Sequence, residues 1–232
     1  ASGLVALSSG DLPSAVAHGT KAASVAPRPD QSLGVAALAA AHQGDLDEAF
    51  ALADRLATAA TSPTIQGFAH YVVGEIDTLA GRMDQAEQRY QQAILLTRKS
   101  GATFVDGIAS VGLLTVLARA GRLGEALDGY LDLIGYWERT GGWIQQWTTL
   151  RNLGRLLRAL GDPETALFLE AAAHSAPDAP AFRGVSDEPD AGALPPDRVR
   201  DIRADAATAS RARVLEVARQ AVDRHRAVLE PA

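Results

Sequence analysis

The sequence predicts an all-α fold built from antiparallel helical hairpins that stack one after another. A short phrase, with a Gly, a polar residue and an Ala five positions after the Gly, occurs five times in 232 residues. Its glycines stand 34, 37, 40 and 40 residues apart, a spacing typical of helical repeat arrays. The hydrophobic fraction of 47% comes mostly from Ala, Leu and Val. Alanine is the best helix former and leaves room for close helix contact, so this composition favours closely packed helices over a sheet.

Each phrase is interpreted as the turn between two helices. The glycine and alanine pairs are Gly10 and Ala15, Gly44 and Ala49, Gly81 and Ala86, Gly121 and Ala126, and Gly161 and Ala166. We expect the glycine to end a helix, because glycine enters the left-handed C-terminal cap without steric cost. A second helix then begins, with acidic residues or Pro163 in its first turn. The alanine follows where the antiparallel partner helix has to approach closely.

The repeat around Gly81 resembles the tetratricopeptide (TPR) pattern. With Gly81 at position 15 of the repeat, the small and aromatic positions 8, 20, 24 and 27 hold Gly74, Ala86, Tyr90 and Ala93. The resemblance implies a right-handed superhelical solenoid of TPR-like antiparallel helix hairpins. It covers about residues 1–175, in about five hairpins of which the first is truncated.

The later repeats follow the TPR pattern in part. The repeat around Gly121 keeps Ala126 and Tyr130. The repeat around Gly161 keeps its small residues but has Glu170 where the aromatic residue belongs. The first two repeats keep the turn and lose the aromatic residue.

The lengthened repeats also resemble the sensor region of bacterial STAND-type transcriptional regulators, the LuxR-like and SARP-type activators. The segment 160–173 looks much like the last repeat of that class, and a Pro-rich segment and a final helix follow it. In such regulators DNA-binding and nucleotide-binding domains precede the TPR region. Because the chain opens without Met inside an apolar periodic segment, we expect it to be a piece of a longer protein.

The C-terminal quarter changes in composition. Residues 176–197 are rich in Pro, Gly and Asp, which predicts a loop. Residues 198–229 carry a broken apolar stripe among Arg and Asp residues, which predicts a helix. We expect this helix to pack on the repeat array and cap its end.

Catalytic chemistry has little support in the sequence. The chain has no Cys, which excludes disulfides, thiol nucleophiles and Cys-based zinc sites. Its five His residues are scattered, without the spacing of a metal site. We expect no enzyme activity, no metal and no cofactor. The net charge of −6 argues against direct nucleic-acid binding, and no apolar run is long enough for a membrane span, so we expect a cytoplasmic protein.

The TPR resemblance also implies a concave groove lined by the first helix of each hairpin. The residues that match its lining positions are Phe68, Tyr71, Glu75, Val111, Thr115, Arg119, Arg151, Arg155 and Arg158. The three last arginines share one helix face. They could hold an acidic peptide, a carboxylate or a phosphate. Alternatively they form a solvated face paired with acidic neighbours, and this second interpretation is favoured.

Two tryptophans, Trp143 and Trp147, stand one turn apart after the predicted helix break at Gly141 and Gly142. Large aromatic side chains serve mainly as buried area, so we favour a place in the core between repeats. The alternative is an exposed pair beside the arginines that anchors a partner.

Two classes of function follow. In the first, the chain is a protein-interaction or signal-sensing domain of a larger multidomain transcriptional regulator, and a partner or effector in its groove shifts the parent protein between states. The partner is then a protein, a peptide or another domain of the same parent chain, and self-association is a further expectation. In the second, the chain is a stand-alone TPR scaffold that docks a peptide tail, unrelated to transcription. The lengthened repeats and the Pro-rich tail favour the first.

Overall fold

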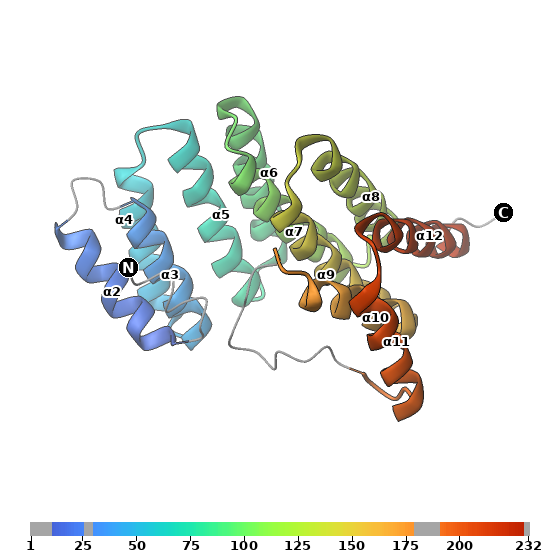
Figure 1. The fold of residues 1–232 in the computed structure, drawn as a ribbon. Coiled ribbons are helices and arrows are strands. Elements are labelled where there is room, and N and C mark those ends of the chain that lie inside the picture. The colour runs from blue at the N-terminus through green and yellow to red at the C-terminus, as the bar shows by residue number, and fades with distance from the viewer. Residues whose placement is uncertain (1–10, 26–29, 179–190, 230–232) are drawn as a thin grey trace. The chain divides into compact units, whose positions relative to one another are not determined.

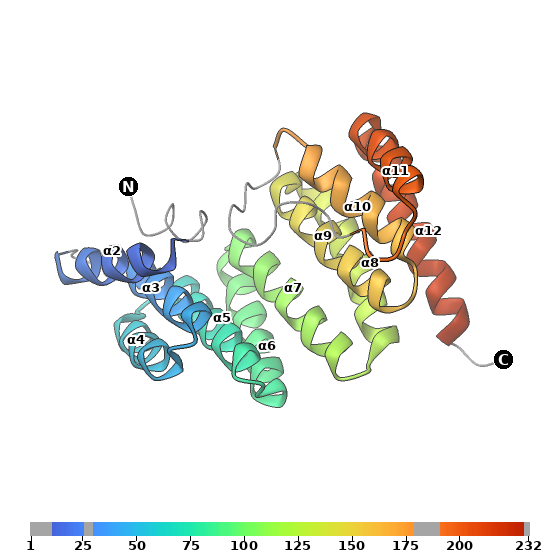
Figure 2. The same ribbon diagram turned by 90° about the horizontal axis from the view of Figure 1, so that it is seen from below.

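The computed structural model describes residues 11–25, 30–178 and 191–229. Within these ranges the chain is all-helical, with eleven helices and no strand (Figures 1 and 2). The all-α class predicted from the sequence is therefore confirmed. The chain divides into two compact units after Val116, inside helix α7 (Thr103–Arg119).

The first unit contains the helices before this division and most of α7. They are α2 (Leu12–Val25), α3 (Asp30–Gln43), α4 (Leu46–Ala59), α5 (Pro63–Leu79) and α6 (Met83–Ser100). From α2 to α6 each helix packs on the next, and α5 also packs on α3. The main core between α3, α4 and α5 is rich in alanine, and its larger members include Leu33, Leu52, Leu56 and Ile76. A second cluster around Tyr90 joins α6 to α7.

The second unit begins with the end of α7 and contains the remaining helices. They are α8 (Leu123–Thr140), α9 (Trp143–Ala159), α10 (Pro163–Ser175), α11 (Pro196–Thr208) and α12 (Arg211–Leu229). Helices α8, α9 and α10 pack in sequence, α11 packs on α10, and α12 packs on α8, α9 and α10. Fully buried aromatic and leucine side chains fill its interior, among them Trp137 and Tyr130.

The predicted glycine turns have one common geometry. The glycines at positions 44, 81, 121 and 161 all have φ between 76° and 87°. In each turn the glycine N–H donates to the carbonyl three residues back, and the next N–H donates to the carbonyl five residues back, over 2.8–3.2 Å. This is the Schellman motif, which satisfies the last carbonyls of the helix. Gly10 lies outside the described residues.

The alanine of each phrase is completely buried, as the sequence predicts. Ala15, Ala49, Ala86, Ala126 and Ala166 all have 0% exposure. The helices that follow the turns begin as expected, with acidic residues in the first turn and with Pro163 at the first position of α10.

The C-terminal segment differs from the prediction of one helix over 198–229. It forms two helices, because Ala209 takes an extended conformation and Ser210 begins a new helix. The Ser210 hydroxyl oxygen accepts a hydrogen bond from the Arg213 N–H at 3.3 Å, as a helix N-cap does. The predicted loop 176–197 is also shorter at its end, since α11 starts at Pro196; residues 179–190 lie outside the described residues. No helix in the described ranges has the length and apolarity needed to cross a bilayer.

Candidate functional site

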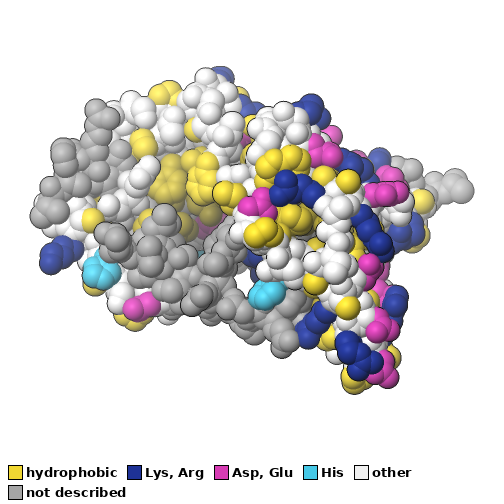
Figure 3. Space-filling view, in the orientation of Figure 1, with side chains coloured by type: hydrophobic (Ala, Val, Ile, Leu, Met, Phe, Trp, Pro, Cys, Tyr) yellow, Lys and Arg dark blue, Asp and Glu magenta, His cyan; other side chains and the backbone are white. Residues whose placement is uncertain are grey.

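Three predicted groove residues come together on α5 in the first unit. Phe68 and Tyr71 are half-buried, and their stacked rings lie 6.2 Å apart. The Phe68 ring covers Gly34 of α3 so closely that a Cβ there would lie 2.3 Å from its Cε1 atom. Glu75 follows one turn after Tyr71. In Figure 3 hydrophobic side chains gather over α5 on the visible face.

Tyr90 of α6 holds Glu75 in place. Its hydroxyl donates to Glu75 Oε1 at 2.7 Å and lies 3.1 Å from the Thr78 hydroxyl. Burial, and then the nearby Glu75 carboxylate, raise the pKa of Tyr90 far above its ordinary value. The phenol therefore stays protonated and can donate its hydrogen bond to the Glu75 carboxylate. Sequence reasoning assigned Tyr90 to the repeat pattern and did not include it in the site.

The groove residues predicted on α7 contribute less. Val111 is buried, and the Thr115 hydroxyl donates to the Val111 carbonyl of its own helix at 2.9 Å. Arg119 is exposed and lies beyond the division between the two units.

The three predicted arginines of α9 have different surroundings. Arg158 donates two hydrogen bonds to the Glu170 carboxylate, at 2.8 and 2.9 Å, across to α10. Arg155 is exposed and donates to Asn152 on its own helix at 3.3 Å. Arg151 is half-buried. The acidic neighbour expected by the favoured interpretation is thus present for Arg158.

Glu170 occupies the position where the repeat pattern expects an aromatic residue. A Cβ at Gly154 would lie 3.0 Å from Glu170 Cγ, just as a Cβ at Gly74 would lie 2.9 Å from the Tyr90 ring. The partners match as well, since Arg158 and Thr78 both stand three residues before a glycine turn. The ion pair of Arg158 with Glu170 in the second unit therefore takes the place of the contact between the Thr78 and Tyr90 hydroxyls in the first.

The tryptophan pair contacts Asp178, which follows α10, and the first residue of α12. Trp147 is 5% exposed, and its Nε1–H donates to Asp178 Oδ1 at 2.8 Å. Arg211, the first residue of α12, donates to Asp178 Oδ2 at 2.6 Å. Its guanidinium carbon lies 4.2 Å from the centroid of the Trp143 ring and 5.6 Å from that of Trp147.

The charge of Asp178 is stabilised in this arrangement. Desolvation acts to raise its pKa, but the hydrogen bond from Trp147 and the charge of Arg211 outweigh it and hold the pKa below its ordinary value. The core position favoured for the tryptophans fits the buried Trp147, whereas Trp143 is half-buried. Sequence reasoning missed both Asp178 and Arg211, since neither lies in a recognisable motif.

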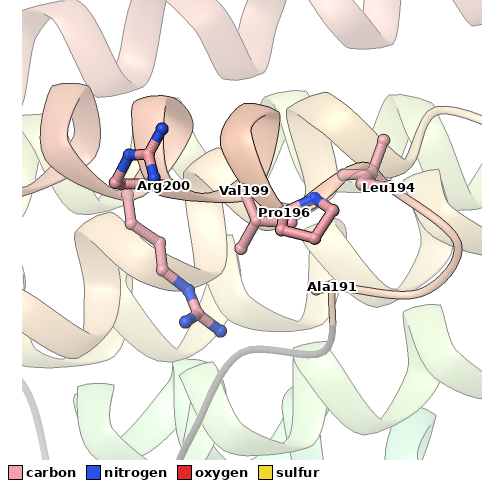
Figure 4. Close-up of a pocket in the computed structure, with 6 residues that line it drawn as sticks. Ala191, Leu194, Pro196, Val199 and Arg200 are labelled. Carbon is pink, nitrogen blue, oxygen red and sulfur yellow. The ribbon is translucent and has the colours of Figure 1, made fainter.

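Two shallow openings lie elsewhere on the molecule. One, of about 500 Å³, borders the start of α11 and is lined by Leu194, Pro196, Val199 and neighbouring residues (Figure 4). The other, of about 410 Å³, lies between Leu33 of α3 and the Asp54 to Ala59 side of α4. Neither contains a His, and among the described residues no group of three His, Asp or Glu side chains could hold a metal ion.

No protein-family model matches the chain, and no curated protein matches it. Among solved structures, the crystal structure of BtubC (BKLC) from P. vanneervenii is similar, with a TM-score of 0.55. The match covers 96% of this chain and 92% of that chain at 16% sequence identity. At this identity the similarity concerns the fold alone.

Proposed function

We propose that the chain is a solenoid of TPR-like hairpins that serves as a non-catalytic protein-interaction or signal-sensing domain. The observation that carries this proposal is the repetition of one local geometry. Four glycine turns share the same pair of backbone hydrogen bonds, and each is followed five residues later by a fully buried alanine. Repeats of this kind present the same helix face several times over, which suits the binding of an extended partner.

The proposed binding faces lie on the first helix of the hairpins. On α5 the face consists of Phe68, Tyr71 and Glu75, where half-buried rings supply apolar contact and the carboxylate is oriented by Tyr90. On α9 it consists of Arg151 and Arg155, whose guanidinium groups carry positive charge. A protein segment with acidic side chains, or another domain of the same parent protein, suits the α9 face.

The proposed setting is a larger multidomain transcriptional regulator in the cytoplasm. There, occupation of these faces would bias the parent protein between inactive and active states by differential affinity. The support for this setting is the resemblance of the lengthened repeats and the Pro-rich tail to the STAND-type regulators.

The test is affinity capture from a native lysate with the wild-type chain and with Arg155→Glu, at low and raised salt. The matched control is Arg139→Glu, the same change at an exposed arginine of α8. We expect a specific partner that is retained by wild type and the control, released by salt and lost with Arg155→Glu. Capture that is identical for all three proteins would refute binding at the α9 face. Capture of a nucleotide-binding domain would favour the regulator over the stand-alone scaffold.

A further inference from the structure

The surroundings of Arg211 form a compact binding site for a guanidinium group. Trp143 and Trp147 come from α9, and Asp178 follows the end of α10; we call these three residues the Trp–Asp cage. The cage offers a guanidinium group two ring faces and one carboxylate. This combination recognises a planar cation by its charge and its shape.

Asp178 and Trp147 orient each other through a contact that does not involve Arg211. Asp178 accepts the indole N–H of Trp147 through Oδ1, which leaves Oδ2 for the cation. Trp147 is buried, so its ring cannot turn away freely. The Nε atom of Arg211 is buried without a hydrogen-bond partner. Ring contact and a single carboxylate oxygen therefore hold the cation, rather than a full set of hydrogen bonds.

Helix α12 does not depend on this contact for its position. Its apolar face is buried through Val214, Leu215 and Ala218. Arg219 pairs with Glu138 of α8, and Arg226 pairs with Asp128 of α8 at 2.7 Å. Figure 3 shows basic and acidic side chains gathered over the part of the molecule that contains α8 and α10 to α12. A change of side-chain rotamer at Arg211 is thus enough to empty the cage while α12 stays in place.

We propose that the Trp–Asp cage is a guanidinium-binding site that Arg211 occupies in cis and that an arginine side chain of a protein partner can occupy in its place. The ligand class follows from the group already bound, which is an arginine. The cage residues are different from the groove residues of the proposed function, and the proposal does not rest on that function.

The test uses the full chain and its three indole N–H signals in a nitrogen–proton NMR spectrum. Arg211→Ala empties the cage, and N-acetyl-arginine amide is titrated into the variant and into wild type. We expect saturable binding to the variant in the millimolar range, as suits a contact with one charged side chain. Wild type should bind at least about tenfold more weakly, because Arg211 competes for the cage.

The spectrum carries its own internal control. The signals of Trp143 and Trp147 should move in Arg211→Ala and return toward their wild-type positions as the arginine amide binds. Trp137, whose buried Nε1–H donates to Thr149 at 3.1 Å, should stay unchanged. Equal binding of N-acetyl-citrulline amide, which has nearly the same shape without the charge, would overturn the proposal.

A control variant at a different arginine and a second substitution of Arg211 complete the design. Arg213→Ala removes an exposed arginine that pairs with Asp205 at 2.8 Å, and it should behave like wild type. Should Arg211→Ala fail to fold, Arg211→Gln removes the guanidinium group and its charge but keeps a polar side chain, and the same criteria apply. Absence of saturable binding to a folded Arg211 variant, or equal binding to Arg213→Ala, would overturn the proposal.

Discussion

Arg158 and Glu170 join α9 to α10 through two parallel hydrogen bonds of 2.8 and 2.9 Å, in the place where an earlier hairpin joins Thr78 to Tyr90. Glu170 is 7% exposed. One position of the repeat thus holds a phenol in one hairpin and a carboxylate in another, and in both hairpins it contacts the residue three before the glycine turn.

Removal of the Glu170 carboxylate should destabilise the second unit. In Glu170→Ala the charge of Arg158 loses the acceptor that faces it in a largely buried setting, and we expect a loss of about 3 kcal/mol in the free energy of unfolding. Urea denaturation measures this loss. The exposed pair of Arg198 and Glu164 is the control, and Glu164→Ala should cost no more than about 1 kcal/mol.

The same pair allows a test of equivalence between repeats. The double variant Arg158→Thr with Glu170→Tyr recreates the pairing of Thr78 with Tyr90, and it should be more stable than Glu170→Tyr alone. Additive effects of the two changes would contradict the equivalence.

Gly112 of α7 should tolerate no side chain. Its added Cβ would lie 2.5 Å from the Tyr90 ring, so we expect Gly112→Ala to destabilise the first unit by about 1–3 kcal/mol through overpacking. Gly124 in α8 is the matched control, because nothing lies within 4 Å of its added Cβ. Gly124→Ala should leave stability unchanged or raise it by up to about 1 kcal/mol. Thermal melting of both variants checks the difference, and two similar melting temperatures would contradict it.

The packing of α12 predicts a large loss of stability when one of its valines is shortened and almost none for another. Val222 is fully buried, whereas Val228 is 82% exposed. Val222→Ala should therefore cost about 2 kcal/mol of unfolding free energy, from lost burial and the cavity left behind. Val228→Ala should change it by less than about 0.5 kcal/mol. Equal effects in chemical denaturation would show that α12 does not pack on the second unit as described.

Asp77 of α5 should make the stability of the first unit depend on pH. Its side chain is 5% exposed and lies 3.4 Å from Arg82. Desolvation outweighs the nearby arginines and raises the pKa of Asp77 above its ordinary value of 3.8. As pH rises from this value toward the raised one, the unfolded chain loses its proton first, so stability falls across that window. At pH values above the raised pKa, the stability contributed by protonated Asp77 is fully lost.

The variant Asp77→Asn removes this titration. Its stability relative to wild type should rise as pH increases from about 3 toward neutral, because only wild type has to bury a charge. Unfolding free energies at several pH values measure the difference. A difference that is constant over this range would refute the raised pKa of Asp77.

The helices and their turns follow from short-range preferences that can be read in the sequence. The glycines at positions 44, 81, 121 and 161 end helices because the left-handed cap is a local conformation. The alanine five residues later is buried because its distance from the turn sets the face on which it lies. The break before Ser210 was also local and could have been found, since Ser is a preferred N-cap residue.

The tertiary structure alone decided what the charged and aromatic side chains contact. Glu170 stands twelve residues from Arg158, and Arg211 stands 33 residues from Asp178 and 64 from Trp147. Such contacts depend on how whole helices pack, which no local pattern encodes. The sequence by itself therefore determined the helical elements and the buried small residues of this protein. Long-range packing determined that Arg158 faces a carboxylate and that Arg211 fills the Trp–Asp cage.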